Sequence, residues 1–218
     1  MKSNREYRDM PIGIVVRDDE TPETDEMIVS GYASTFDEPY TLYEDDEIIY
    51  REQVAPEAFD DTDMEDVIMQ YDHEGRVFAR IKNETLTVST DDKGLYIEAN
   101  LGGTDIGRGL YQEIAGGYTD KMSFGFTVNA DEETRTEAED GRVDILRTIT
   151  GISKLYDVSA VSIPANGGTS IGVSTRNKIN GVIEDVRAER LEAERIELER
   201  QRIEVRARAL KGKESDND

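Results

Sequence analysis

A series of short segments rich in β-branched and aromatic residues constrains the fold of this chain more than any other feature. Turn-forming residues separate eight such segments, at 12–16, 27–35, 47–52, 86–90, 94–101, 121–129, 142–150 and 155–163. Residues of these types favour strands, and DDKG at 91–94 separates two segments as a hairpin turn does. Many short strands in one chain predict a closed or nearly closed antiparallel sheet.

Two segments that interrupt the strand series predict helices. One follows Pro56 and covers 56–70, and the other follows Thr104 and covers 104–116. Each opens with acidic residues, which suit the N-terminus of a helix. The acidic stretch 131–141 predicts a solvated loop. The expected fold class is therefore α+β, a mostly antiparallel closed β-barrel with a few covering helices and a long charged C-terminal helix.

The composition changes at about Asn177. The following residues contain no Pro, almost no Gly and dense charge of both signs, which predicts one helix over 178–211, roughly 50 Å long at about 1.5 Å per residue. Two interpretations of this helix remain open, a solvated charged helix and an arm that binds a partner or a scaffold. Its aliphatic side chains form two sevenfold series on different faces, Leu191, Leu198 and Val205, and Ile196, Ile203 and Leu210.

The predicted organisation has four parts. A flexible N-terminus covers 1–10, a β-rich domain 11–176, a helical extension 177–213 and a disordered tail 214–218.

Composition excludes several classes of function for these 218 residues. The chain has no cysteine, which rules out disulfides, thiolate metal sites and cysteine nucleophiles, and we expect no cofactor. The formal net charge of −23 repels phosphate backbones, so direct nucleic-acid binding is disfavoured. No apolar run is long enough to span a membrane, and the first residues lack the apolar centre of a secretory signal. We expect neither membrane insertion nor export.

Ser123 lies in a segment with strict two-residue alternation. In KMSFGFTV, Met122, Phe124 and Phe126 occupy one face of the predicted strand, and Ser123 occupies the other, away from the core. The segment LYDVSAV alternates in the same way, with Tyr156, Val158 and Ala160 on one face and Asp157 and Ser159 on the opposite face. If the two strands are neighbours, a hydroxyl and a carboxylate share one wall.

His73 is the only histidine in the chain. An imidazole can remove a serine proton, and a carboxylate can hold the imidazole in the required tautomer, so Ser123, His73 and Asp157 are candidates for a catalytic triad. A surface or structural role for His73 is the competing interpretation, and sequence spacing does not show that the three residues meet.

Other constellations are weaker. A Ser–Lys dyad would join Ser123 to Lys121, but the lysine would need burial to lose its charge. DDTDMED at 60–66 lacks the glycine of a calcium loop, and 72–74 (Asp-His-Glu) are adjacent residues that do not converge easily on one metal ion. The glycines at 102–109 are not followed by the GK[ST] of a phosphate loop.

The ordered landmarks along 28–173 carry a family resemblance. They are GYASTFDE (31–38), VAPEAF (54–59), MQYDHEGRVFARI (69–81), DDKGLYIEANL (91–101), GRGLYQEIAGGYTDKMSFGF (107–126) and LYDVSAVSIPAN (155–166). In this order they resemble the capsid maturation (prohead) proteases of tailed viruses, of the Hong Kong 97 type. The resemblance implies a serine endopeptidase with an assemblin-like β-barrel.

By position, the resemblance assigns the family's histidine to His73 and its serine to Ser123. Asp157 stands where the family often has glutamate, and PEAF stands where it prefers PGAF. The resemblance further implies major capsid protein or scaffold segments as substrates, self-cleavage and self-association. The implied location is the prohead of a virus or integrated provirus in the host cytoplasm. The competing hypothesis is a non-catalytic capsid scaffold or assembly protein that acts through the helical tail.

Overall fold

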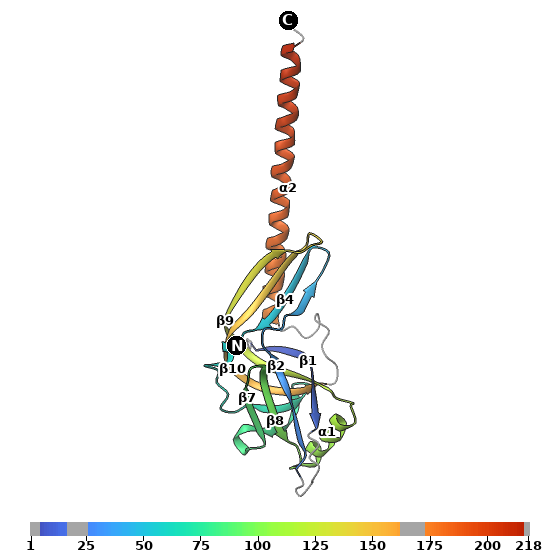
Figure 1. Ribbon diagram of the computed structural model, residues 1–218, viewed down its shortest axis with the longest axis vertical. Coiled ribbons are helices and arrows are strands. Elements are labelled where there is room, and N and C mark those ends of the chain that lie inside the picture. The colour runs from blue at the N-terminus through green and yellow to red at the C-terminus, as the bar shows by residue number, and fades with distance from the viewer. Residues whose placement is uncertain (1–4, 17–25, 162–172, 216–218) are drawn as a thin grey trace. The chain divides into compact units, whose positions relative to one another are not determined.

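The computed structural model describes residues 5–16, 26–161 and 173–215. The chain divides into two compact units, a body at Met1–Arg176 and a helical unit at Asn177–Asp218. The body is mainly strands, with one α-helix at its lower end in Figure 1. Its elements are β1 (Glu6–Val16), β2 (Ile28–Thr35), β3 (Tyr40–Glu44), β4 (Ile48–Val54), η1 (Pro56–Phe59), β5 (Ile68–Tyr71), β6 (Glu74–Arg80), η2 (Ile81–Asn83), β7 (Leu86–Thr90), β8 (Gly94–Asn100), α1 (Asp105–Ala115), β9 (Lys121–Glu137) and β10 (Val143–Val161).

The strands join into one sheet of ten strands. Eight of them follow the order β3-β4-β10-β9-β1-β2-β8-β7, and the β5–β6 hairpin attaches to β10. All pairings are antiparallel except those of β10 with β4 and with β5. These pairings support the expected α+β class. Within the described residues they run as an open path from β3 to β7, so closure into a barrel stays a prediction.

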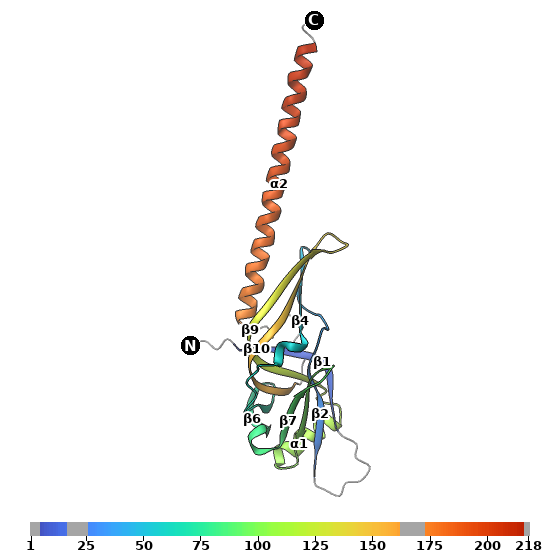
Figure 2. The same cartoon turned by 60° about the vertical axis from the view of Figure 1, so that its left-hand side comes forward.

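The strands β9 and β10 are longer than the sequence predicts. Figures 1 and 2 show them running side by side with β4 beyond the rest of the sheet. The stretch 131–141, expected to be a solvated loop, pairs with β10 as far as Glu137. The described residues of the two segments expected at 142–150 and 155–163 belong to one continuous strand, Val143–Val161. The loop prediction is wrong for 131–137, because cross-strand contacts hold these acidic residues, as the hydrogen bond from Tyr50 Oη to Glu133 Oε1 (2.7 Å) illustrates. It is correct for 138–141, which form the exposed turn between β9 and β10.

The helix expected at 56–70 is also wrong. Only Pro56–Phe59 is helical, as a single 3-10 turn, and Ile68–Tyr71 forms strand β5. Met69 of this strand is fully buried in the core, and the strand pairs with β10, so tertiary burial overrides local helix preference. The second predicted helix is confirmed as α1, where Thr104 Oγ1 accepts a hydrogen bond from the Gly107 amide at 3.1 Å.

The hydrophobic core of the body includes one face of β9. Met122, Phe124 and Phe126 are fully buried there, as their alternation predicts, and the rings of Phe124 and Phe126 stack with centroids 4.4 Å apart. On β10, Val158 and Ala160 also lie in the core, as predicted. The third core residue there is Leu155, and not Tyr156, which was expected to share their face. A register irregularity between Leu155 and Asp157 displaces Tyr156 from the predicted face.

Strand β1 begins inside the segment expected to be flexible. Its first residues, from Glu6, pair with β9, and Glu6 and Arg8 are both buried. Arg8 Nη2 lies 2.5 Å from Glu6 Oε2 and 2.9 Å from Glu52 Oε2, while Arg147 Nη1 lies 2.7 Å from Glu52 Oε2 and 3.0 Å from Glu6 Oε2. We call Glu6, Arg8, Glu52 and Arg147 the buried ionic cluster. It joins β1, β4 and β10 and so holds Glu6 and Arg8 against the sheet.

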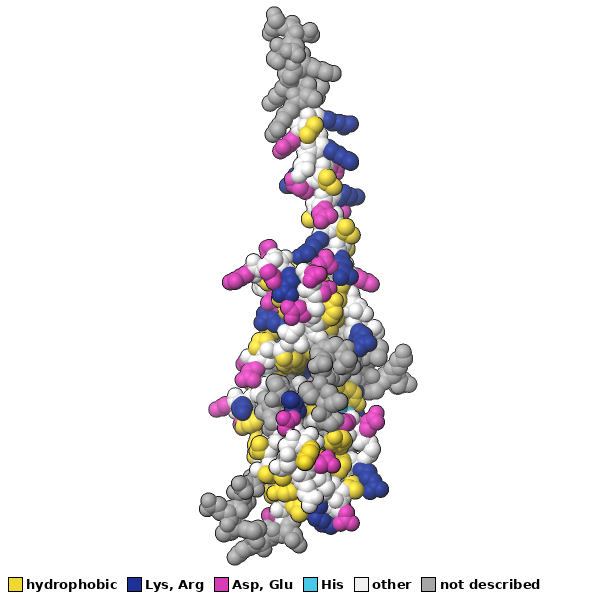
Figure 3. Space-filling view, turned by 90° about the vertical axis from the view of Figure 1, so that its right-hand side faces the viewer, with side chains coloured by type: hydrophobic (Ala, Val, Ile, Leu, Met, Phe, Trp, Pro, Cys, Tyr) yellow, Lys and Arg dark blue, Asp and Glu magenta, His cyan; other side chains and the backbone are white. Residues whose placement is uncertain are grey.

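The long helix is α2 (Val173–Ser215), which begins before and ends after the predicted 178–211. The described members of its two aliphatic series are exposed, with Leu191 at 67% and Ile203 at 62%, and Figure 3 shows such side chains interspersed with charged ones. The side chain of Leu210 and residues 216–218 of the expected tail lie outside the described residues. No helix in the described part of the chain is long and apolar enough to cross a membrane.

Candidate active site

Three chain segments bring the predicted site residues together. His73 lies in the turn between β5 and β6, Ser123 on β9 and Asp157 on β10. The imidazole joins the other two, because His73 Nε2 is 2.6 Å from Ser123 Oγ and His73 Nδ1 is 2.5 Å from Asp157 Oδ1. Both distances are within hydrogen-bonding range. The arrangement has the order hydroxyl, imidazole, carboxylate.

The turn that carries His73 has an uncommon backbone. Asp72 and His73 have φ angles of 49° and 58°, in the left-handed region, and together they connect β5 to β6. A two-residue hairpin turn with positive φ at both positions prefers Asn-Gly or Asp-Gly, so His73 costs local stability where a glycine would not. The Asp72 amide donates a hydrogen bond to the carbonyl of Ala160 at 3.0 Å, which fixes the turn against β10. The imidazole is therefore held at the end of a hairpin whose conformation the neighbouring strand maintains.

Strand register places the hydroxyl and the carboxylate next to each other. Ser123 on β9 lies opposite Ser159 on β10, and Gly125 on β9 lies opposite Asp157. A Cβ atom at Gly125 would lie 2.3 Å from Asp157 Oδ2. The glycine of SFGF thus leaves the space in which the carboxylate sits.

The sequence predicts the correct face for Ser123 but the wrong environment. Its neighbours Met122 and Phe124 belong to the core, and Ser123 contacts His73 on the other face. Ser123 and Asp157 are fully buried, and the His73 side chain is only 15% exposed, so this face of the sheet is covered. An outward-facing position on a strand becomes buried when a hairpin folds over it, and alternation alone does not reveal this.

Three further side chains touch the site without having been predicted. Ser159 Oγ donates to Asp157 Oδ1 at 3.0 Å, Arg5 Nη1 lies 3.4 Å from Asp157 Oδ2, and the Tyr7 and His73 rings have centroids 4.4 Å apart. The shared strand face of Asp157 and Ser159 is a signal that could have found Ser159. No sequence signal identifies Arg5 or Tyr7, since they lie far from the triad in the chain.

The structure also locates the residues of the two alternative sites, a Ser–Lys dyad and a metal site. The Lys121 ammonium, which the Ser–Lys dyad requires, is partly exposed and lies 3.7 Å from Asp120 Oδ1. In the part of the chain that the structure describes, no group of three or more histidine, aspartate or glutamate side chains is arranged to hold a metal ion.

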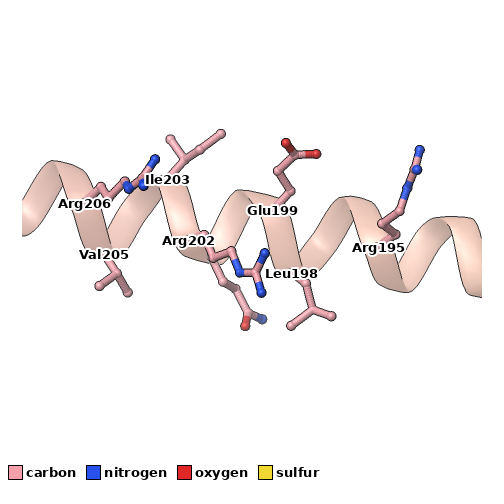
Figure 4. Close-up of a pocket in the computed structure, with 8 residues that line it drawn as sticks. Arg195, Leu198, Glu199, Arg202, Ile203, Val205 and Arg206 are labelled. Atoms are coloured by element: carbon pink, nitrogen blue, oxygen red, sulfur yellow. The ribbon is translucent and has the colours of Figure 1, made fainter.

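Two surface hollows differ in their relation to these residues. The larger is lined by side chains of α2 alone, which point in several directions around one helix (Figure 4), so it encloses no ligand. The smaller borders the turn that carries His73, where Tyr71, Phe78 and Ile106 contribute apolar surface. Only the second adjoins the candidate site.

The geometry has the form of a serine hydrolase site on an α+β fold. The model of the caudovirus prohead serine protease family matches residues 13–181, and the chain belongs to this family. No curated protein and no solved structure matches the chain. Family membership makes it a serine peptidase of tailed viruses, with capsid proteins as the implied substrates and the prohead as the implied location.

Proposed function

We propose that this protein is a serine endopeptidase that processes capsid or scaffold proteins, and itself, during prohead maturation in the host cytoplasm. Ser123 is the nucleophile, His73 the general base and then the general acid, and Asp157 orients the imidazole. The single observation that carries the proposal is the placement of the two His73 nitrogens, one 2.6 Å from Ser123 Oγ and the other 2.5 Å from Asp157 Oδ1.

The proposed reaction follows from these contacts. Ser123 Oγ attacks the peptide carbonyl carbon while His73 Nε2 accepts the hydroxyl proton, and His73 then gives that proton to the leaving amine as the C–N bond breaks. A water molecule, activated by the same nitrogen, hydrolyses the acyl ester and regenerates the serine. Asp157 accepts a hydrogen bond from His73 Nδ1–H, which keeps Nε2 unprotonated and stabilises the imidazolium.

The burial of Ser123 adds a condition to this reaction. Its hydroxyl is not exposed, so a substrate must displace a neighbouring group before its carbonyl reaches Oγ. The hollow beside the His73 turn supplies apolar surface from Tyr71, Phe78 and Ile106, which supports an approach of the peptide from that side.

Co-expression with the capsid or scaffold partner tests the proposal. Intact-mass analysis should find new termini with the wild type and none with Ser123→Ala or His73→Ala, since loss of either residue costs on the order of 10³ to 10⁶ in rate. Ser153→Ala is the matched control, because its exposed hydroxyl bonds only to the Thr127 carbonyl among the contacts described. Normal processing by Ser123→Ala would refute the assignment.

The helix α2 and the closure of the sheet bear on the rival function and on the proposed assembly. Assembly that depends on α2 and proceeds without any proteolysis would favour the rival function, a non-catalytic capsid scaffold. The exposed aliphatic side chains of α2 are the observation that favours this rival. We also propose self-association and an assemblin-like closed barrel, which the sheet order leaves open.

A further inference from the structure

The first residues of the ordered chain alternate between two environments. From Arg5 to Arg8, the even-numbered residues enter the buried ionic cluster and the odd-numbered residues face the triad. Such alternation is the ordinary geometry of a strand, whose successive side chains point to opposite faces. One short segment is thereby anchored on one side and touches the candidate active site on the other.

The even-numbered residues, Glu6 and Arg8, hold the segment in place. Arg8 is buried and bonds to the carboxylates of Glu6 and Glu52, and the Thr175 hydroxyl donates to Glu6 Oε2 at 2.8 Å. Removing any one charge from such a cluster would leave an uncompensated buried charge, so the segment does not detach easily. The positions of Arg5 and Tyr7 are set by these contacts and by pairing with β9.

The odd-numbered residues, Arg5 and Tyr7, contact two members of the triad, Asp157 and His73. Arg5 Nη1 lies 3.4 Å from Asp157 Oδ2, the oxygen that does not face His73, and the Arg5 guanidinium carbon lies 3.8 Å from the Tyr156 ring centroid. The Tyr7 ring packs at 56° against the imidazole, with centroids 4.4 Å apart. Tyr7 also lies opposite Gly125 in the strand register.

These residues lie outside the region that the family match covers, which begins at residue 13. Arg5 and Tyr7 therefore supply contacts to the site from a part of the chain that the match does not include.

We propose that Arg5 and Tyr7 are positioning residues for the triad, a role that rests on the proposed peptidase function. Arg5 holds the second oxygen of Asp157 so that the first faces His73 Nδ1. Tyr7 limits rotation of the imidazole, so that Nε2 stays directed at Ser123. Loss of a well-oriented base is costly, because a displacement of about 1 Å can lower the rate by roughly 10²-fold.

Two readouts distinguish positioning from simple structural support. Arg5→Lys keeps a positive charge that can lie beside Asp157 and should recover part of the lost rate, and the imidazole that Asp157 contacts should itself report the loss of Arg5.

The test measures labelling of Ser123 by an alkyl fluorophosphonate in the full chain. This probe forms a bond between Oγ and phosphorus with loss of fluoride, and it needs no knowledge of the natural substrate. Arg5→Met should label about 10- to 100-fold more slowly than the wild type, with Arg5→Lys in between. Ring ¹⁵N resonances of the single histidine should also differ from those of the wild type, because Asp157 no longer holds Nδ1 in the same way.

One control variant and two variants of Tyr7 accompany the test. Arg51→Met removes a partly exposed pair with Asp144 on the same sheet and should label like the wild type. Tyr7→Ala should label more slowly than the wild type, and Tyr7→Phe, which keeps the ring beside the imidazole but loses the hydroxyl that accepts from Arg5 Nη1 at 3.4 Å, should recover most of the rate. Circular dichroism and thermal melting establish that each variant is folded.

Different results overturn different claims. If the wild type labels and Arg5→Met labels at the same rate with the same histidine resonances, the positioning role is wrong while the peptidase proposal stands. Faster labelling of Arg5→Met would mean that the segment covers the nucleophile, which also contradicts positioning. If the wild type is not labelled at Ser123, the peptidase proposal fails, and the positioning role fails with it.

Discussion

At the scale of single residues, the candidate site depends on a position with no side chain. Gly125 lies between Tyr7 and Asp157 in adjacent strands, and a Cβ atom there would lie 2.9 Å from Tyr7 Cε1 and 2.3 Å from Asp157 Oδ2. Real Cβ atoms do not approach oxygen so closely, so a larger residue would force the carboxylate to move. The glycine is therefore part of the site although it carries no reactive atom.

We predict that Gly125→Ala lowers fluorophosphonate labelling of Ser123 by about 10²-fold or more, because the displaced carboxylate no longer orients His73. Overpacking should also cost about 1–3 kcal/mol of stability. The matched control is Gly109→Ala, where a Cβ atom meets nothing within 4 Å in the interior of α1 and should stabilise the helix by up to about 1 kcal/mol. Equal labelling of the two variants would contradict the role assigned to Gly125.

At the scale of elements, buried charges join strands that are distant in the chain. Arg147 of β10 bonds to Glu6 of β1 and Glu52 of β4, and its Nε lies 2.6 Å from Asp131 Oδ2 of β9. Burial alone would raise the pKa of the Glu6 carboxyl, but the guanidinium groups of Arg8 and Arg147 outweigh burial and lower it. The carboxylate is therefore ionised where it stands, and the cluster holds because each charge has partners.

We predict that Arg147→Met destabilises the fold by about 3–5 kcal/mol, because it leaves two buried carboxylates with too little positive charge. Arg51→Met is the comparison, since the Arg51 side chain is 35% exposed in its pair with Asp144 and should contribute about 0–1 kcal/mol. Urea unfolding followed by circular dichroism measures both. Similar small losses in the two variants would show that the buried cluster is dispensable for stability.

At the scale of the whole molecule, two electrostatic effects oppose each other as the pH falls. The net charge of −23 produces long-range repulsion, which lessens as carboxylates gain protons and which salt screens over about 10 Å at 0.1 M. Glu6 acts in the other direction. Its pKa in the folded protein lies below the ordinary 4.5, so the unfolded chain takes up the proton first, and stability is lost as the pH falls below that value.

We therefore predict that the melting temperature at low salt rises from pH 7 to about pH 5 and falls below about pH 4.5. At high salt the initial rise should disappear while the fall remains, because the buried cluster is poorly screened. Glu6→Gln removes the titrating group and should make the fall shallower. A fall of undiminished steepness in that variant would contradict the contribution assigned to Glu6.

The sequence by itself predicted the strand-rich body, helix α1, the long helix α2 and the three candidate site residues. These rest on local signals: alternation places Met122 and Phe124 in the core and Ser123 on the opposite face, and His73 is the only histidine. The closed barrel, the roles of the site residues and the substrates stay predictions.

Only the tertiary structure decided how those residues meet. In place of the helix expected at 56–70, the structure has a 3-10 turn at Pro56–Phe59 and strand β5. It also joins Val143–Val161 into one strand and brings Arg5 and Tyr7 to the triad. Pairing with β10 and burial of charges that are far apart in the chain determine these features. Such contacts are non-local, so no pattern within a short window of sequence can encode them.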